Sequence, residues 1–191
     1  MKNSKENEVV TTDDFENELP SCDAEKKVSE EEKLEKAKKW DKRFMEMAEF
    51  IGGWSSCLKT NYPVGAVIVK DKKVLTTGYN GAPSGIKSCV ERGICIRQRD
   101  NIPSKTMREH CYAVHAEQNA IAQAARFGIS VEGATLYCTH APCSICARMI
   151  INSGIRQIIY RNEHNDEFSQ QLLKEAGIKI RCLPYDNKEN E

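Results

Sequence analysis

The sequence predicts an α/β fold with a five-stranded mixed sheet flanked by helices in three layers. Short runs rich in β-branched residues alternate with segments of helical periodicity. The last three expected strands are separated by one helix each, and such strand–helix–strand units join parallel strands through right-handed crossovers. The first two expected strands are separated only by a short turn, so we expect them to pair as an antiparallel hairpin.

The composition is that of one soluble globular domain with polar appendages. The chain has 191 residues, of which 40% are hydrophobic and 29% charged, which is enough for one sizeable core. No apolar run approaches the length of a membrane span, and no apolar segment of a secretory signal follows the N-terminus. A cytoplasmic location is therefore expected, and a nuclear location stays open as the alternative. In a reducing compartment the nine cysteines are expected to be metal ligands or buried thiols.

Charge divides the chain into an acidic start and a basic remainder. Residues 1–32 hold four Lys against eleven Asp or Glu, so the rest of the chain carries the compensating positive charge. We expect a disordered acidic tail at residues 1–28, because it has too little apolar surface to fold. The predicted folded domain spans residues 29–183, and residues 184–191 are expected to form a short C-terminal tail. The basic balance of the domain suits a phosphate-bearing substrate, although an incidental excess fits equally well.

The first expected element is a helix that begins at a capping box. Ser29 is followed three residues later by Glu32, and apolar residues then recur at helical spacing up to Gly52. An irregular stretch at residues 79–112 interrupts the pattern, and a loop of this length is usually functional or held by something other than a core. The other expected elements are strands at 64–69, 74–78, 134–139, 155–160 and 178–183 and helices at 116–127, 142–153 and 167–176.

Two short motifs contain the residue types of a catalytic zinc site. His115 and Glu117 form a His-x-Glu motif at one predicted helix start, and Pro142, Cys143 and Cys146 form a Pro-Cys-x-x-Cys motif at the next. One histidine and two cysteines can hold zinc while a water fills the fourth position. Cys143 and Cys146 share one face of a helical turn, and helix starts stabilise thiolates. A glutamate that is not a ligand can then move protons between the water and a substrate.

In this order and spacing, the two motifs form the signature of zinc deaminases that act on cytosine or adenine. Either motif alone would be weak. A Cys-x-x-Cys pair also occurs in redox proteins and structural zinc fingers, and a histidine near a glutamate can be an ordinary surface pair. The two motifs are separated by one helix and one strand, and together they favour a deaminase zinc site.

Four stretches of the sequence match those of a known enzyme family, at residues 64–69, 78–85, 115–121 and 135–146. With the elements between them they cover roughly residues 40–183. The chain therefore resembles the deoxycytidylate (dCMP) deaminases of the cytidine-deaminase-like superfamily. The zinc motifs indicate the superfamily, and the Gly-Tyr-Asn-Gly-x-Pro-x-Gly stretch indicates the deoxycytidylate branch. The resemblance implies the three-layer cytidine-deaminase-like fold.

The resemblance also implies roles for individual residues. His115, Cys143 and Cys146 would bind a catalytic Zn²⁺, and Glu117 would be the proton shuttle. The implied reaction is the hydrolysis of dCMP to dUMP with release of ammonia, which supplies dUMP for thymidylate synthesis. Asn80 is expected to contact the sugar of the substrate, and the backbone of Ala116 is expected to contact the cytosine ring. The backbone near His140 and Ala141 is expected to accept from the departing amino group.

Regulation and assembly are further expectations from the resemblance. Enzymes of this kind are homo-oligomers, with a hexamer favoured here. We expect dCTP to activate and dTTP to inhibit, with Mg²⁺ accompanying the effector nucleotide near residues 78–85. The acidic tail is not part of the family pattern.

The residues that would bind the substrate phosphate stay open. Tyr62 and Pro63 stand where relatives often have basic or polar residues. Four arginines of the irregular stretch could meet a phosphate, although a solvated face fits equally well. They are Arg92, Arg97, Arg99 and Arg108.

Two alternative functions stay open at this point. A deaminase of another nucleoside, or of adenosine in tRNA, would keep the same zinc chemistry. A nucleic-acid deaminase would need a basic or aromatic track for flanking nucleotides, and 7% aromatic residues with an acidic tail argue against it. A zinc-stabilised interaction module without turnover is the alternative from another class, but Glu117 is intact here. We therefore expect neither a nucleic acid nor a membrane as partner.

Four further cysteines lie in or near the irregular stretch: Cys57, Cys89, Cys95 and Cys111. Four thiols around a loop without a core predict a second, closed structural zinc, as some relatives have. Their spacing is not that of a Cys-x-x-Cys knuckle, and buried free thiols are the alternative. His110 could replace one of the four.

Overall fold

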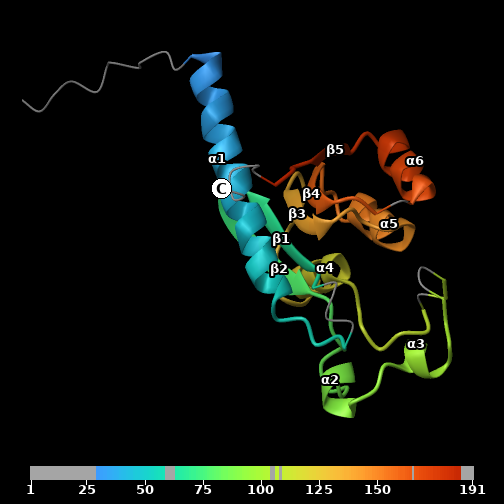
Figure 1. The fold of residues 1–191 in the computed structure, drawn as a ribbon. Coiled ribbons are helices and arrows are strands. Elements are labelled where there is room, and N and C mark those ends of the chain that lie inside the picture. Colours follow the sequence, from blue (N-terminus) through green and yellow to red (C-terminus); the bar gives the residue numbers. More distant parts are fainter. Residues whose placement is uncertain (1–28, 59–62, 104–105, 108, 165, 186–191) are drawn as a thin grey trace, which may run out of the picture.

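The computed structural model describes residues 29–58, 63–103, 106–107, 109–164 and 166–185 (Figure 1). The predicted tail at residues 1–28 lies outside the described residues, as do residues 186–191 of the predicted C-terminal tail. No helix in the described part of the chain is long and apolar enough to cross a membrane. The elements follow in the order α1 (Glu30–Gly52), β1 (Gly65–Lys70), β2 (Lys73–Tyr79), α2 (Cys89–Arg92), α3 (Ile96–Arg99), α4 (Ala116–Arg126), β3 (Thr135–His140), α5 (Ser144–Asn152), β4 (Gln157–Asn162), α6 (Glu167–Glu175) and β5 (Lys179–Cys182).

The strands form one mixed sheet in the order β2-β1-β3-β4-β5. β1 is antiparallel to both of its neighbours, whereas β3, β4 and β5 run parallel, which confirms the predicted five-stranded mixed sheet. Gly65 pairs with Tyr79 and Ala66 pairs with Cys138. The start of β1 therefore lies at the same end of the sheet as the ends of β2 and β3.

Helices cover both faces of the sheet, as Figure 1 shows. Successive residues of a strand point to opposite faces, and β1 supplies both cores. Val67 and Val69 belong to the core that includes α1, whereas Ala66 and Ile68 belong to the core that includes α4 and α5. This arrangement confirms the three-layer fold.

Two glycines allow helices to approach the sheet at the end where β1 starts. A Cβ on Gly65 would overlap with the carbonyl oxygen of Ala48 on α1. A Cβ on Gly78 of β2 would overlap with the carbonyl oxygen of Ala116, the first residue of α4. Glycine in a strand marks such a close approach of two backbones. Gly78 therefore allows the start of α4 to lie directly on β2.

The described residues of the stretch 79–112 include two one-turn helices that were not predicted, α2 and α3. Arg97 of α3 is buried and donates hydrogen bonds to the carbonyl oxygens of Pro103, Thr106 and Met107. The buried guanidinium of Arg97 therefore holds Pro103, Thr106 and Met107 through their backbone carbonyl groups, where an apolar core would otherwise be needed.

A polar contact ties α1 to the sheet within its apolar layer. Tyr137 of β3 donates a hydrogen bond of 2.7 Å to Asp41 of α1, and Arg181 of β5 lies 2.5 Å from the same carboxylate. Burial, assisted by this bond and the nearby negative charge, raises the pKa of Tyr137. The phenol therefore keeps its proton in the folded state at pH values that ionise an unfolded tyrosine.

We expect Tyr137→Phe to lower the free energy of unfolding by about 1–2 kcal/mol at neutral pH, because it removes a donor to a largely buried carboxylate. The pKa of Tyr137 is higher in the folded state, so its contribution is present below about pH 10 and is lost as the pH rises through the folded-state value. Urea unfolding should therefore show that the difference in free energy of unfolding between wild type and variant becomes smaller above about pH 10.

Tyr160→Phe is the matched control for this change, because Tyr160 lies on the adjacent strand β4 and no hydrogen bond of its hydroxyl is found among the described residues. It should cost less stability at neutral pH. An equal loss in both variants would show that the bond to Asp41 contributes nothing specific.

Candidate metal centre and active site

His115 stands immediately before α4, as its N-cap residue. Its backbone is extended, with φ −70° and ψ 154°, and its N–H donates a hydrogen bond of 3.1 Å to the side chain of Gln118. Asn119 of the same turn donates to the carbonyl oxygen of Tyr79 at 2.8 Å, which ties the helix start to the end of β2. The direction of the His115 side chain is thus set by the junction of α4 with the sheet.

Cys143 occupies the corresponding N-cap position of α5, and Cys146 lies in the first turn of that helix. The helix was expected to begin at Pro142, but it begins at Ser144, because Cys143 has extended dihedral angles (φ −78°, ψ 169°). Cys146 is fully buried and Cys143 is 3% exposed. Both thiols therefore lie in the core layer formed by α4 and α5.

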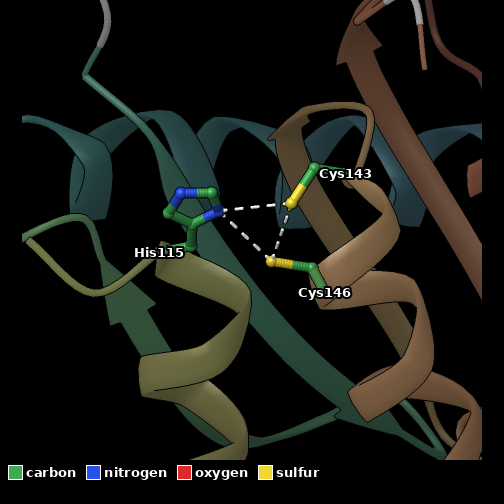
Figure 2. Close-up of side chains that lie close together, drawn as sticks. All are labelled: His115, Cys143 and Cys146. Carbon is green, nitrogen blue, oxygen red and sulfur yellow. Dashed lines mark hydrogen bonds between the residues drawn. The ribbon is translucent and has the colours of Figure 1, made fainter. Parts of the chain in front are cut away.

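The structure brings His115, Cys143 and Cys146 together (Figure 2). His115 Nδ1 lies 3.5 Å from the sulfur of Cys143 and 3.3 Å from that of Cys146, and the two sulfurs are 3.7 Å apart. Tetrahedral zinc with ordinary bond lengths requires about 3.6 Å between nitrogen and sulfur and about 3.8 Å between sulfurs. Among the described residues, no other three side chains of ligand type have their ligand atoms within 4.8 Å of one another. The residues present therefore fit a zinc ion.

The two thiols of this cluster differ in acidity because they share a proton. The hydrogen bond between the two thiols, supported by His115, lowers the pKa of Cys143 well below its ordinary value. The same bond and burial raise the pKa of Cys146. One thiolate is thus already favoured at the start of α5, where the helix dipole stabilises negative charge.

Glu117 is the buried carboxyl group beside this cluster. It is 4% exposed, and burial raises its pKa, while the charge of His115 lowers it. Cys138 of β3 lies close enough to Glu117 for the carboxylate, together with burial, to raise the pKa of that thiol. Cys138 is therefore a protonated core thiol, as its position on a strand predicts.

Asn80 and Ala116 lie where β2 meets α4. The side-chain oxygen of Asn80 accepts a hydrogen bond of 2.9 Å from the N–H of Val64, and its carbonyl oxygen accepts one of 3.0 Å from the hydroxyl of Ser55. These bonds fix the orientation of the Asn80 amide. Ala116 is fully buried and begins α4 above Gly78.

His140 is the last residue of β3, and Ala141 follows it. The ring of His140 lies 3.1 Å from the Thr139 hydroxyl, and burial, with a smaller effect of His164, lowers the pKa of His140. The N–H of Ala141 donates to the carbonyl oxygen of Asn162 at 2.9 Å. The peptide that precedes Pro142 is thereby oriented.

The four cysteines of the predicted second zinc site approach one another without closing a site. Cys89 and Cys95 are buried, Cys57 and Cys111 half-buried, and after burial the charges of the other three thiols raise the pKa of Cys89. The N–H of Val90 donates to the carbonyl oxygen of Ser56, which brings α2 next to Cys57. These thiols lie near each other, but no three of them come within 4.8 Å.

The polar residues of the same region have partners of their own. His110 lies 3.3 Å from Asp100, whose other oxygen accepts from Arg99 at 2.7 Å. Arg92 lies over the ring of Tyr112, 4.3 Å from its centre. Arg97 donates to backbone carbonyls as described above, and Arg108 lies outside the described residues.

Sequence reasoning missed three residues that contact the loop before α5: Asn162, Asp166 and Ser169. Asp166 accepts from the N–H of Ser144, and Ser169 donates to the carbonyl oxygen of Pro142. The Asp-x-x-Ser pattern before α6 is a recognisable helix start. It contains no hint that the same residues contact α5.

The region that contains both motifs, residues 38–162, matches the family model described as the cytidine and deoxycytidylate deaminase zinc-binding region. The chain belongs to this deaminase family. The deoxycytidylate deaminase of Saccharomyces cerevisiae is 38% identical over 147 residues, which cover 76% of this chain and 45% of the yeast protein. That of Mycobacterium phage D29 is 39% identical over 129 residues, which cover 65% of this chain and 95% of the phage protein. The chain spans about half the length of the yeast relatives it matches.

A solved structure of the deaminase family has the same fold. The crystal structure of dCMP deaminase from the cyanophage S-TIM5 in complex with dCMP and dUMP matches with a TM-score of 0.61 and 29% sequence identity. The match covers 76% of this chain and 97% of that chain. It supports the arrangement of sheet and helices described above, and the family description supports zinc as the metal of the cluster.

Proposed function

We propose that the chain is a zinc-dependent hydrolase that converts dCMP and water to dUMP and ammonia. The observation that carries this proposal is the buried Glu117 beside a cluster of one histidine and two cysteines with the spacing of a tetrahedral zinc site. The names of the relatives and the phage structure with dCMP and dUMP support the choice of substrate.

In the proposed reaction Glu117 moves two protons. His115, Cys143 and Cys146 hold the zinc, which when bound supplies a water with a lowered pKa. Glu117 accepts a proton from this water and delivers it to N3 of cytosine while the oxygen adds to C4. The second proton of the water then passes through Glu117 to the amino nitrogen, the C4–N bond breaks, a C4 carbonyl forms and ammonia leaves. Burial suits this role, because it raises the pKa of Glu117 towards the range where a carboxyl both accepts and donates.

The substrate contacts in this proposal come from the junctions around the cluster. The side-chain oxygen of Asn80 is held by Val64, so the amide nitrogen would donate to the sugar. The backbone of Ala116 would contact the cytosine ring at the start of α4. The carbonyl oxygens near His140 and Ala141 would accept from the departing amino group.

We also propose the domain boundaries, location and regulation that the resemblance implies. Residues 29–183 form the catalytic domain of a cytoplasmic enzyme that supplies dUMP for thymidylate synthesis. The chain assembles into a homo-oligomer, with a hexamer favoured, that dCTP with Mg²⁺ activates and dTTP inhibits. An exposed aromatic cluster supports an interface near the effector loop. The ring of Trp54 contacts those of Phe50 and Tyr79, and Phe50, Trp54 and Tyr79 are 66%, 54% and 37% exposed.

A substrate panel on zinc-loaded protein tests the proposed reaction. Ammonia release is followed from dCMP, deoxycytidine, CMP and adenosine in tRNA, with and without dCTP and Mg²⁺. We expect turnover of dCMP alone, raised by dCTP and lowered by dTTP. Turnover of deoxycytidine or tRNA would replace the substrate but keep the zinc chemistry, whereas no turnover of any substrate would favour an interaction module.

Glu117→Gln is expected to bind zinc normally but to lose roughly 10²–10⁴-fold in kcat, because the amide cannot carry the protons. Zinc content and kcat for dCMP are measured on the same preparation. Glu132→Gln is the control, because Glu132 is an exposed carboxylate paired with Arg156 at 3.4 Å. Normal turnover of Glu117→Gln would remove Glu117 from the chemistry.

We further propose that Cys57, Cys89, Cys95 and Cys111 bind a second, structural zinc. The approach of Cys57, Cys95 and Cys111 to Cys89, all four as free thiols, supports this proposal. Closing the site requires the four sulfurs to contract around the ion. Such a contraction would link α2 to the segments that contain Cys57 and Cys111.

Metal analysis distinguishes the two proposed zinc sites. We expect about two zinc ions per wild-type chain and about one in both Cys143→Ser and Cys89→Ser, because each variant removes one ligand of a four-ligand site. Only Cys89→Ser should also lower the melting temperature strongly. Cys182→Ser is the control cysteine and should keep both ions. One zinc ion in the wild type, lost only in Cys143→Ser, would reject the structural site.

A further inference from the structure

The loop that carries Cys143 is held by side chains from a later part of the chain. This loop, residues 141–143, joins the end of β3 to the start of α5. The residues that contact it are Asn162 at the end of β4, and Asp166 and Ser169 at the start of α6. Figure 1 shows α5 and α6 next to each other on one side of the sheet.

The first contact is a pair of hydrogen bonds between strand ends. The side chain of Asn162 donates to the carbonyl oxygen of Thr139 at 2.8 Å. The carbonyl oxygen of Asn162 accepts from the N–H of Ala141 at 2.9 Å. Asn162 therefore forms hydrogen bonds with the backbone on both sides of His140, at Thr139 and at Ala141.

The second contact reaches the residues that flank Cys143. The hydroxyl of Ser169, which is 2% exposed, donates to the carbonyl oxygen of Pro142 at 2.7 Å. One carboxylate oxygen of Asp166 accepts from the N–H of Ser144 at 3.0 Å, and the other accepts from the N–H of Ser169 at 3.0 Å. Asp166 thus binds the starts of α5 and α6 at the same time.

These contacts supply a cap that α5 cannot supply for itself. The first N–H groups of a helix lack partners within the helix, and an N-cap side chain normally accepts from one of them. The N-cap residue of α5 is Cys143, whose side chain makes no such bond and points to the metal cluster. Asp166 therefore accepts from the first turn of α5 in place of the residue that the zinc requires.

We propose that Asn162, Asp166 and Ser169 are positioning residues that hold Cys143 and the adjoining loop in the geometry needed for metal binding and deamination. This inference rests on the proposed function, since it assumes zinc at His115, Cys143 and Cys146. None of the three residues belongs to the cluster of His115, Cys143 and Cys146. Their effect reaches the reaction through Cys143 and through the backbone near His140 and Ala141.

Zinc release distinguishes this role from ordinary structural support. The variants are Asp166→Asn, which can still cap α6 but has only one acceptor oxygen, and Ser169→Ala. Zinc transfer to a chelator is followed in time, and the phase that is absent from Cys143→Ser is assigned to the cluster. We expect zinc release in this phase to be about tenfold faster in both variants. Mutation of a residue that holds a metal ligand in place typically weakens metal binding by about 10- to 100-fold, and tenfold is the lower end of that range.

Ser153→Ala is the matched control at the other end of α5. Its hydroxyl also donates to a backbone carbonyl, that of Ile150, at 2.8 Å. It should release zinc at the wild-type rate. The visible spectrum of the cobalt-substituted proteins is a second readout, because it reports the geometry of the two thiolates around the metal. This spectrum should change in Asp166→Asn and Ser169→Ala, but not in Ser153→Ala.

Two results would overturn the inference. If both variants release zinc at the wild-type rate and have the wild-type cobalt spectrum, the contacts serve stability alone, even if the melting temperature falls. Should Asp166→Asn fold poorly, Ser169→Ala decides by the same criteria. A wild-type protein that takes up no zinc at the cluster would reject the proposed function and this inference together, which separates that failure from the first.

Discussion

Three ligand atoms can share one zinc ion only if the starts of α4 and α5 are held at a fixed separation, and much of the fold serves that separation. α4 lies on β2 through Gly78, whereas α5 follows the end of β3. β1 lies between these strands, so their separation is about two strand spacings, close to 10 Å. This distance is also the ordinary separation of two packed helices. The sheet order and the helix packing therefore agree on where His115 and Cys143 must lie.

The antiparallel β1 contributes to the same end of the sheet. Because it runs opposite to β3, its first residue lies beside the end of that strand, and the N–H of Gly65 donates to the Thr139 hydroxyl at 3.2 Å. The rim around the cluster is thus built from one strand start and several strand ends. That geometry brings Asn80 and His140 to one region, although sixty residues separate them in the sequence.

The sequence predicted what depends on local pattern and on the chemistry of ligands. The five strands follow from runs of apolar residues, and the cluster follows from two motifs at helix starts. The helix α3 was not predicted, because Arg97 looks like an exposed charge until the carbonyl groups around it are known. The helix α2 was missed although Ser88 and Glu91 form a capping box before it, because one helical turn is too short to show a hydrophobic period. The start of α5 was placed two residues early, because Pro142 favours a first helical turn whereas Cys143 requires an extended backbone. The contacts of Asp166 and Ser169 could not be predicted, because they join segments that meet only once β4 and α6 lie beside α5.

The distance in sequence between Cys143 and Asp166 also bears on how the protein forms during translation. The ribosome releases all three cluster residues before it releases residues 162–169. A nascent chain that ends between these points would have every metal ligand but no acceptor for the first turn of α5. Stable metal uptake would then wait until β4 and α6 have emerged and folded.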